Sequence, residues 1–334
     1  MRLLVGLIIY LLVVSNAYAD AFKIGWIGPL TGNSAVLGID SLQAAKLVVD
    51  NANRNLNAKN QFELLIEDDQ YDTSKTVSAY TKLVSQGVKF ILASTYGGIF
   101  AIAERAQKDG VIVINPLDCN EDIAKLPENI FCIATLSESV GSAIAEDLRS
   151  KDIISAAVIF DEKNPFMSLV ANTIKNYQGI KISDFIAVDQ ASTDFRAETL
   201  RIRANKADSI IFLGHDPMGN AMRQARIVGI KGQFYTVGTI TSPGFQSLAG
   251  EAATGALVAY WEAPSSTALS DFLSDFEKRV GRQPILQLAT IPTYDATNIL
   301  VSAINSSETS DIVSIKRSLL GLKGYQGLSG KITI

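Results

Sequence analysis

The chain has 334 residues, of which 47% are hydrophobic and 19% are charged, and this balance excludes a disordered protein. Acidic residues outnumber basic ones by 34 to 30, and the formal net charge of −4 makes nucleic acid and anionic membrane surfaces unsuitable partners. A chain of this length exceeds what one hydrophobic core usually holds, so two domains are expected.

The N-terminal residues have the pattern of a secretory signal peptide. Arg2 precedes an apolar run over residues 3–14, which is shorter than the about 20 residues of a membrane-spanning helix. Small residues at Ala17 and Ala19 frame a cleavage site. We therefore expect export to the periplasm with cleavage after Ala19, and a mature protein that is soluble and monomeric.

Short apolar runs rich in β-branched residues alternate along the chain with stretches of helical periodicity. Strands that are apolar throughout and separated by helices indicate parallel sheets covered on both faces. The sequence predicts strands at residues 23–27, 62–67, 90–93, 111–114, 156–160, 185–188, 209–213 and 234–237. It predicts helices at residues 37–53, 76–85, 99–108, 140–149, 197–204 and 220–228.

This alternation pauses between Pro116 and Ser137, where proline, asparagine and acidic residues gather. A fresh series of strand and helix pairs then begins, so we interpret the stretch as a crossing between two α/β lobes. Three further helical patterns, at residues 269–280, 288–304 and 312–319, suggest that the chain afterwards returns to the first lobe.

A set of motifs, in order along the chain, resembles a known family. Residues 24–32, Ile-Gly-Trp-Ile-Gly-Pro-Leu-Thr-Gly, followed by Leu37-Gly38, resemble the opening of type I periplasmic binding proteins, specifically the branched-chain amino acid or amide-type receptors. The similarity continues at residues 67–72, 110–116, 193–195, 223–229 and 325–331. Each motif is weak by itself, but the ordered set is specific.

The resemblance implies two doubly wound, Rossmann-like α/β lobes joined by a three-strand hinge. It implies a small-molecule ligand in the cleft, delivery to ABC transporter permease subunits, and no cofactor. The first lobe is expected to contain residues 20–135 and about 263–305, and the second lobe residues 136–262 and about 306–334. Relatives usually continue one strand beyond the final glycine motif, so we expect either a shorter edge of the second sheet or a truncated sequence.

The chain has two cysteines, Cys119 and Cys132, and an exported chain meets an oxidising compartment. A disulfide and two buried thiols both remain open, because bridging depends on Cα separation and direction. The single histidine, His215, has no paired cysteine or histidine spacing around it, so no metal site is expected.

Two loops of the first lobe follow predicted strands and could present backbone donors to an anionic ligand group. Residues 28–32 lead from a strand towards a helix, where free N–H groups attract anionic oxygens; the alternative is a tight turn with a helix cap. Residues 94–98, Ser-Thr-Tyr-Gly-Gly, combine hydroxyls with glycines; the alternative is the plain start of a helix. Amino-acid receptors of the family usually have a serine where this chain has Gly97-Gly98.

Residues 115–120 form a third candidate segment, in which Asp118 could pair with a cationic ligand group. As a solvated loop acid or a helix cap, Asp118 would need no function. In the second lobe, Phe166 stands where relatives have a tyrosine that covers the ligand. His215 and Asp216 end a strand beside the expected cleft. Leucine-type receptors commonly have an acidic residue near Gly238, so Asp118 or Asp216 would have to neutralise a ligand ammonium here.

We expect a binding protein that closes around its ligand, and not an enzyme. Asp68-Asp69 is interpreted as a strand end, and no Gly-x-Ser-x-Gly elbow supports Ser-His-Asp chemistry. A ligand-sensing module of the same fold, signalling to a membrane partner, is the alternative. The ligand itself stays open among amino acids, amides and organic acids. The candidate ligand-binding residues are Leu37, Ser94, Thr95, Tyr96, Gly97, Gly98, Asn115, Asp118, Cys119, Phe166, His215, Asp216, Gly238 and Thr239.

Overall fold

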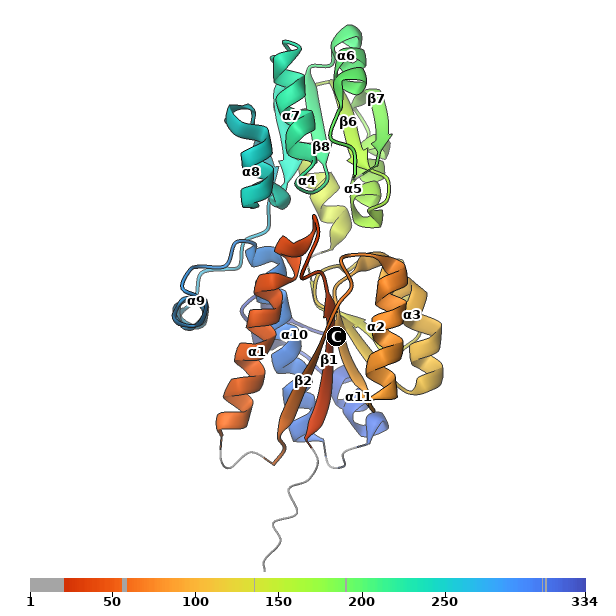
Figure 1. Cartoon of the computed structure of the whole chain (residues 1–334), viewed down its shortest axis with the longest axis vertical. Coiled ribbons are helices and arrows are strands. Elements are labelled where there is room, and N and C mark those ends of the chain that lie inside the picture. Colours follow the sequence, from red (N-terminus) through yellow and green to blue (C-terminus); the bar gives the residue numbers. More distant parts are fainter. Residues whose placement is uncertain (1–20, 56–58, 135, 190, 308, 310) are drawn as a thin grey trace, which may run out of the picture.

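The helices and strands of the protein form two α/β lobes, one above the other (Figure 1). The computed structural model describes residues 21–55, 59–134, 136–189, 191–307, 309 and 311–334. The predicted signal peptide lies outside the described residues. Within the described part of the chain, no helix is both long and apolar enough to cross a lipid bilayer.

The first lobe is built on five parallel strands. They are β1 (Phe22–Gly28), β2 (Phe62–Asp68), β3 (Phe90–Ala93), β4 (Ile112–Asn115) and β5 (Ile130–Cys132). Their order in the sheet is β2-β1-β3-β4-β5. β3 and β4 are buried along their whole length, which explains why all their residues except Asn115 at the end of β4 are apolar.

Helices cover both faces of this sheet. The helices of this lobe are η1 (Ala35–Leu37), α1 (Ile39–Arg54), α2 (Thr73–Ser85), α3 (Tyr96–Asp109), η2 (Ile123–Lys125), α9 (Thr267–Val280), α10 (Gln287–Ser306) and α11 (Ile312–Leu320), of which α9 packs on α1 and α10. On one face, Trp26 of β1 packs in a cluster with Leu42 of α1 and Ile299 of α10. On the other face, α2 and α3 pack through Leu83 and Ile102.

The second lobe repeats this plan. Its strands are β6 (Ser155–Asp161), β7 (Lys181–Val188), β8 (Ser209–Leu213), β9 (Gln233–Val237) and β10 (Leu257–Ala259). They pair in parallel in the order β10-β9-β8-β6-β7. Its helices are α4 (Ser137–Ser150), α5 (Pro165–Asn176), α6 (Arg196–Asn205), α7 (Met218–Ile227), η3 (Gly238–Thr241), α8 (Pro243–Ala249) and η4 (Gly250–Ala253). In each lobe the first strand lies between the second and the third, so both sheets have a switch point beside their first strand.

The described chain crosses between the lobes twice, once between β5 and α4 and once between β10 and α9. After α11, strands β11 (Tyr325–Gly327) and β12 (Gly330–Ile332) form an antiparallel hairpin. The third crossing that the resemblance implied is therefore not found among the described residues.

The C-terminal elements pack on the first lobe, and not on the second lobe as predicted for residues about 306–334. Ile315 and Leu319 of α11 belong to the same buried cluster as Ile24 of β1. The carboxylate of Asp295 in α10 accepts hydrogen bonds from the backbone N–H of Leu328 (2.8 Å) and Ser329 (2.7 Å). In Figure 1 the blue helices α10 and α11 accordingly lie in the lower lobe with the red and orange N-terminal elements. The C-terminal segment lies on the first lobe because the first sheet and its helices bury the apolar face of α11.

Candidate ligand-binding site

A cavity of about 80 Å³ lies between the two lobes. One water molecule needs about 10–15 Å³, so the cavity has room for several times that volume. Its walls are mostly apolar. The first lobe contributes Leu37, Tyr71, Leu117, Asp118, Leu286 and Leu288, and the second lobe contributes Ser137, Val140, Asn164, Phe166, Met167, His215, Val237, Gly238, Thr239 and Ala259. Trp261, which follows β10, completes the lining.

The position of the cavity follows from the direction of the strands. Tyr71 follows β2 and Asp118 follows β4, while Asn164, His215 and Gly238 follow β6, β8 and β9. Both sheets therefore turn their carboxyl ends towards the same space. Open parallel sheets bind ligands beyond the carboxyl ends of their strands, so the cavity lies where this fold places a ligand.

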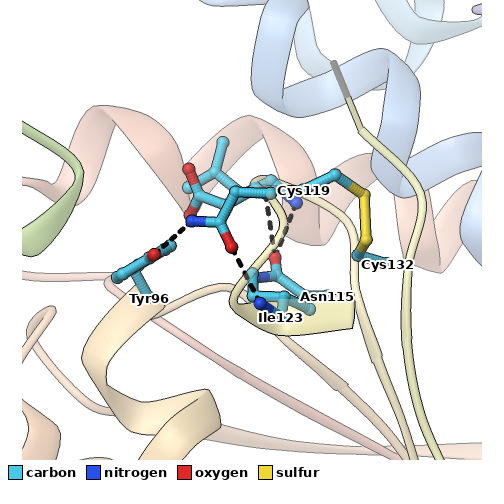
Figure 2. The surroundings of a disulfide bond; sticks show 8 residues. Tyr96, Asn115, Cys119, Ile123 and Cys132 are labelled. Atoms are coloured by element: carbon cyan, nitrogen blue, oxygen red, sulfur yellow. Dashed lines mark hydrogen bonds between the residues drawn. A yellow bond between two sulfur atoms is a disulfide. The ribbon is translucent and has the colours of Figure 1, made fainter. Parts of the chain in front are cut away.

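The loop after β4 holds Asp118 against the cavity. The side-chain oxygen of Asn115 accepts hydrogen bonds from the backbone N–H groups of Leu117 (2.8 Å) and Asp118 (3.1 Å). Cys119 and Cys132 are joined by a disulfide with a Cα–Cα distance of 5.5 Å, which ties the loop to β5 (Figure 2). Of the two alternatives that the sequence left open, the structure therefore contains the disulfide.

The carboxyl group of Asp118 is buried without a compensating partner. The residue is 2% exposed, and its Oδ2 atom has no hydrogen-bond partner among the described residues. Burial disfavours the charged form and raises the pKa of Asp118 to about 7. No lysine or arginine is present among the described residues that line the cavity. The group is therefore placed to gain from a ligand that supplies a positive charge or a hydrogen-bond donor.

His215 faces the cavity from the second lobe as a neutral imidazole. It is 3% exposed, and burial lowers its pKa from 6.5 to about 4. The Oδ1 atom of Asn164 accepts the backbone N–H of Met167 (3.2 Å), so its amide nitrogen is the atom that donates to His215 Nε2 (3.0 Å). The ring proton then sits on Nδ1, which has no partner in the described structure.

Ser137 adds a second unpaired polar group of the second lobe. Its hydroxyl is buried and has no hydrogen-bond partner within the described residues, while its backbone N–H donates to the carbonyl of Cys119 (2.8 Å). Buried polar groups are normally paired, so Asp118, Ser137 and His215 together mark a site for a polar ligand group.

A family model described as "Periplasmic binding protein" matches residues 21–334. The chain belongs to the periplasmic binding protein family. Groups of three histidine, cysteine, aspartate or glutamate side chains that could hold a metal ion do not occur in the part of this periplasmic binding protein that the structure describes.

Several relatives of this periplasmic binding protein are named as amino-acid-binding proteins. The Pseudomonas aeruginosa protein called leucine-, isoleucine-, valine-, threonine-, and alanine-binding protein is 25% identical over 316 residues, which is 90% of this chain and 82% of the relative. The leucine-binding protein of Thermotoga maritima has a TM-score of 0.85 at 20% identity, covering 94% of this chain and 91% of that chain. The branched-chain amino acid binding protein of Streptococcus pneumoniae, solved with isoleucine, has a TM-score of 0.84 at 21% identity, covering 94% and 92%. These two likenesses show the fold.

Six of the residues predicted from the sequence line the cavity of this periplasmic binding protein, and eight do not. Those that line it are Leu37, Asp118, Phe166, His215, Gly238 and Thr239. Those outside the lining are Ser94, Thr95, Tyr96, Gly97, Gly98, Asn115, Cys119 and Asp216. Asn115 and Cys119 position the loop of Asp118, as described above.

The hydroxyl groups of residues 94–96 are engaged within the first lobe. Ser94 Oγ donates to the Ile27 carbonyl (3.2 Å), and Thr95 Oγ1 donates to the Asp69 carboxylate (2.6 Å). The Tyr96 phenol accepts a hydrogen bond from the side-chain amide of Asn120 (Figure 2). These hydrogen bonds stabilise the start of α3 and leave none of the three hydroxyls on the cavity wall.

The glycines at the start of α3 serve close packing. A Cβ atom at Gly98 would lie 2.4 Å from Thr76 Oγ1 of α2. A Cβ atom at Gly97 would lie 2.5 Å from Thr73 Oγ1 and 3.7 Å from Pro165 of the second lobe. Gly97 therefore marks a place where the two lobes touch.

Two further candidates lie against groups of their own lobe. The backbone N–H of Leu30 (2.8 Å) and the hydroxyl of Thr31 (2.6 Å) both donate to the carboxylate of Asp68. The anion bound by the loop at residues 28–32 is thus a side chain of the protein itself. Asp216 faces Gly244 at the start of α8, where a Cβ would lie 1.9 Å from its Oδ2.

Part of the lining was not predicted from the sequence. Tyr71 and Asn164 follow strands, so their position alone could have indicated them. Leu286 and Leu288 come from the segment after the second crossing, and nothing in their local pattern indicates where that segment returns. The other unpredicted lining residues are Leu117, Ser137, Val140, Met167, Val237, Ala259 and Trp261.

Proposed function

We propose that this periplasmic binding protein captures a small solute in the interlobe cavity by closing its lobes, and delivers the solute to an ABC permease. The observation that carries the proposal is that unpaired buried groups of both lobes, Asp118 of the first and His215 of the second, line one cavity. A ligand that contacts both lobes stabilises the closed form by the difference between its affinities for the two forms. The names of the relatives, which describe binding of leucine, isoleucine and valine among other amino acids, support an aliphatic solute, as do walls that include Leu37 and Leu288.

We further propose that the cavity binds its solute without chemical change. Ser137, His215 and Asp118 all line the cavity, as the members of a hydrolytic triad would. His215 Nε2, however, bonds to Asn164, and neither Ser137 Oγ nor Asp118 Oδ2 has a partner among the described residues. A histidine with a pKa lowered to about 4 is also a weak base at neutral pH.

A thermal-shift screen with protein that has been unfolded and refolded, to remove carried-over solute, tests the binding step. Amino acids, amides, amines and organic acids are added singly, and a true ligand at about 100 times its Kd should stabilise the fold by about 2.7 kcal/mol. Mass spectrometry of the released ligand should find it unchanged. The absence of any stabilising solute, or recovery of a chemically altered one, would contradict the proposal.

Delivery is tested with the permease in proteoliposomes. The liganded protein should stimulate ATP hydrolysis by the permease, and the ligand-free protein should stimulate it less. Stimulation of a membrane kinase or cyclase in place of the permease would favour the sensing role. Export is tested separately, by mass spectrometry of the mature chain, which should begin at Asp20 and run as a monomer in size-exclusion chromatography.

A further inference from the structure

We propose that the solute is a small organic monocation with an apolar body and a neutral hydrogen-bond acceptor, and neither a zwitterion nor an anion. This inference rests on the proposed function, because it names the class of solute for the same interlobe cavity. Three observations carry it: the charge of the lining, the unpaired ring proton of His215, and the engagement of two hydroxyls that a carboxylate could use.

The charges of the lining favour a cation. Asp118 and His215 are its only acidic or basic side chains among the described residues, and His215 is neutral because Asn164 donates to its Nε2 atom. A ligand ammonium would therefore meet one carboxylate and no competing cation. A ligand carboxylate would meet that same carboxylate without any lysine or arginine to balance it, and buried charges are costly without a partner.

The hydrogen bonds of His215 assign the second polar group. With the proton on Nδ1, His215 of the cavity lining has a donor without a partner among the described residues. Such a donor pairs with an oxygen acceptor, and we assign a neutral one, a carbonyl or a hydroxyl, because the lining has no cation to balance a carboxylate. The amino group of the solute then lies at Asp118 in the first lobe and the oxygen at His215 in the second, so that one molecule bridges the lobes.

Two side-chain hydroxyls that could hold a carboxylate at the start of α3 are already in use. Ser94 Oγ and Thr95 Oγ1 donate to Ile27 and Asp69 inside the first lobe. The hydroxyls of Ser94 and Thr95 are therefore not available to a ligand carboxylate in the cavity. The ring of Tyr71 stands on the cavity wall and packs edge-on against His215 at 5.8 Å between ring centres.

Aromatic rings on the wall add a further preference for a positive charge. Tyr71, Phe166 and Trp261 line the cavity beside Asp118. The face of an aromatic ring attracts cations, most strongly where water is excluded. An anion gains nothing from the same faces.

Calorimetry with four ligands of nearly equal shape tests the inference. Leucinamide and leucinol are monocations with a neutral oxygen, leucine is the matching zwitterion, and 4-methylpentanoate is the matching anion. With refolded protein at pH 7, the two monocations should bind at least about tenfold more tightly than leucine, because only leucine and 4-methylpentanoate bring an unbalanced carboxylate. An affinity for leucine or 4-methylpentanoate that equals or exceeds that for leucinamide overturns the inference and leaves solute binding intact.

Substitutions show whether Asp118 is the partner of the cation. Asp118→Asn should weaken the affinity for leucinol by about tenfold or more. Asp216→Asn, which replaces a carboxylate outside the cavity lining, should change that affinity less than about twofold. Equal losses in the two variants would overturn the placement at Asp118.

Proton release gives a readout that a merely structural role would not produce. Burial raises the pKa of Asp118 to about 7, so part of the ligand-free molecules hold this proton at pH 7, and a bound cation should expel it. The groups that interact electrically with it, the phenols of Tyr71 and Tyr96, are uncharged at this pH because burial raises their pKa values above 10. Leucinol binding, repeated in buffers of different ionisation enthalpy, should release protons from the wild type and none from Asp118→Asn.

The remaining outcomes of the ligand screen also decide between a cationic and a non-cationic solute. If none of the four ligands binds, the net charge of the best hit in the wider screen settles the inference: a monocation supports it, and a zwitterion or an anion overturns it. If no solute of any class binds, the proposed function fails together with the inference.

Discussion

Two buried side chains of the cavity, Asp118 and His215, have pKa values displaced in opposite directions. The pKa of Asp118 rises from 3.8 to about 7, and that of His215 falls from 6.5 to about 4. From about pH 4 to 7 folded Asp118 holds a proton that the unfolded chain has lost, so its contribution to stability falls as the pH rises. From about pH 4 to 6.5 the unfolded chain holds a proton that folded His215 lacks. The contribution of His215 to stability therefore rises with pH and offsets the fall in the contribution of Asp118.

Replacing either Asp118 or His215 should reveal how the other residue makes stability depend on pH. We predict that in Asp118→Asn the free energy of unfolding rises with pH more steeply than in the wild type, by about 1.4 kcal/mol per unit between about pH 4.5 and 6.5. Urea denaturation at several pH values measures it. Asp161, whose pKa burial raises to about 6, titrates in both proteins and cancels in the comparison. His215→Asn should show the opposite change, and parallel curves for Asp118→Asn and the wild type would speak against a buried carboxyl group.

For single residues, a position just after a strand was a good indicator of the cavity lining only where that strand end faces the other lobe. His215 was proposed because it ends a strand, and Asp118, which also follows a strand, because it could pair with a cationic ligand group; both line the cavity. Ser94 and Thr95 also follow a strand, but their hydroxyls bond to partners in the same lobe, such as Asp69. Those partners are distant in sequence, so the local pattern does not reveal that the donors are in use.

The contact between α2 and α3 depends on a glycine. A Cβ at Gly98 would lie within 2.7 Å of three side-chain atoms of Thr76, which cannot turn away freely because its hydroxyl donates to Asp69 (2.8 Å). We predict that Gly98→Ala destabilises the protein by about 1–2 kcal/mol, since overpacking outweighs the about 1 kcal/mol of helix propensity that alanine adds. Thermal unfolding measures this, with Ala101→Ser on the exposed side of α3 as the control. A stabilised Gly98→Ala variant would contradict the close packing.

The disulfide joins the loop after β4 to β5. We predict that replacing Cys119 and Cys132 together by serine lowers the free energy of unfolding by about 2–4 kcal/mol, because the open chain regains conformational freedom when unfolded. Solute affinity should also fall, since the neighbouring Asp118 is less firmly held. A reductant should destabilise the wild type and leave the serine variant unchanged. Two free thiols in the denatured, unreduced wild type would show that the bond is absent.

Among the elements, buried strands were predicted most accurately. β3 and β8 have the predicted ends, because strands buried along their whole length are continuous apolar runs. β7 begins at Lys181, earlier than predicted, because an edge strand has exposed polar positions. β5 has only three residues and was read as part of the crossing. α5 and α8 begin with Pro165 and Pro243, which fit a first helical turn but resemble loop signals in a sequence.

For the whole molecule, the two doubly wound lobes could be predicted from the alternation of strands and helices, and the route of the C-terminal segment could not. Local periodicity shows that residues 312–320 form a helix with an apolar face. Which sheet buries that face depends on contacts with Ile24 and Ile299, far away in sequence. The same reason explains why Leu286 and Leu288 were not foreseen in the cavity wall.

Closure of the lobes should be visible in solution. We predict that a stabilising solute lowers the radius of gyration measured by small-angle X-ray scattering, because a bound solute holds Asp118 and His215 of the two lobes together. Asp118→Asn at the same solute concentration should remain closer to the ligand-free profile. An unchanged profile of the wild type under saturation would indicate a rigid pair of lobes.

The disulfide lies at the joint between the lobes as well as beside the site. Cys119 forms a backbone bridge with Leu136, and its carbonyl accepts the N–H of Ser137, the first residue after the crossing. Disulfides of this kind form in oxidising compartments and not in the bacterial cytoplasm. If the chain is exported as proposed, the loop that holds Asp118 would lack its disulfide until the chain has left the cytoplasm. The newly made chain should then bind the solute weakly and should not remove from the cytoplasm the solute that the mature protein collects outside.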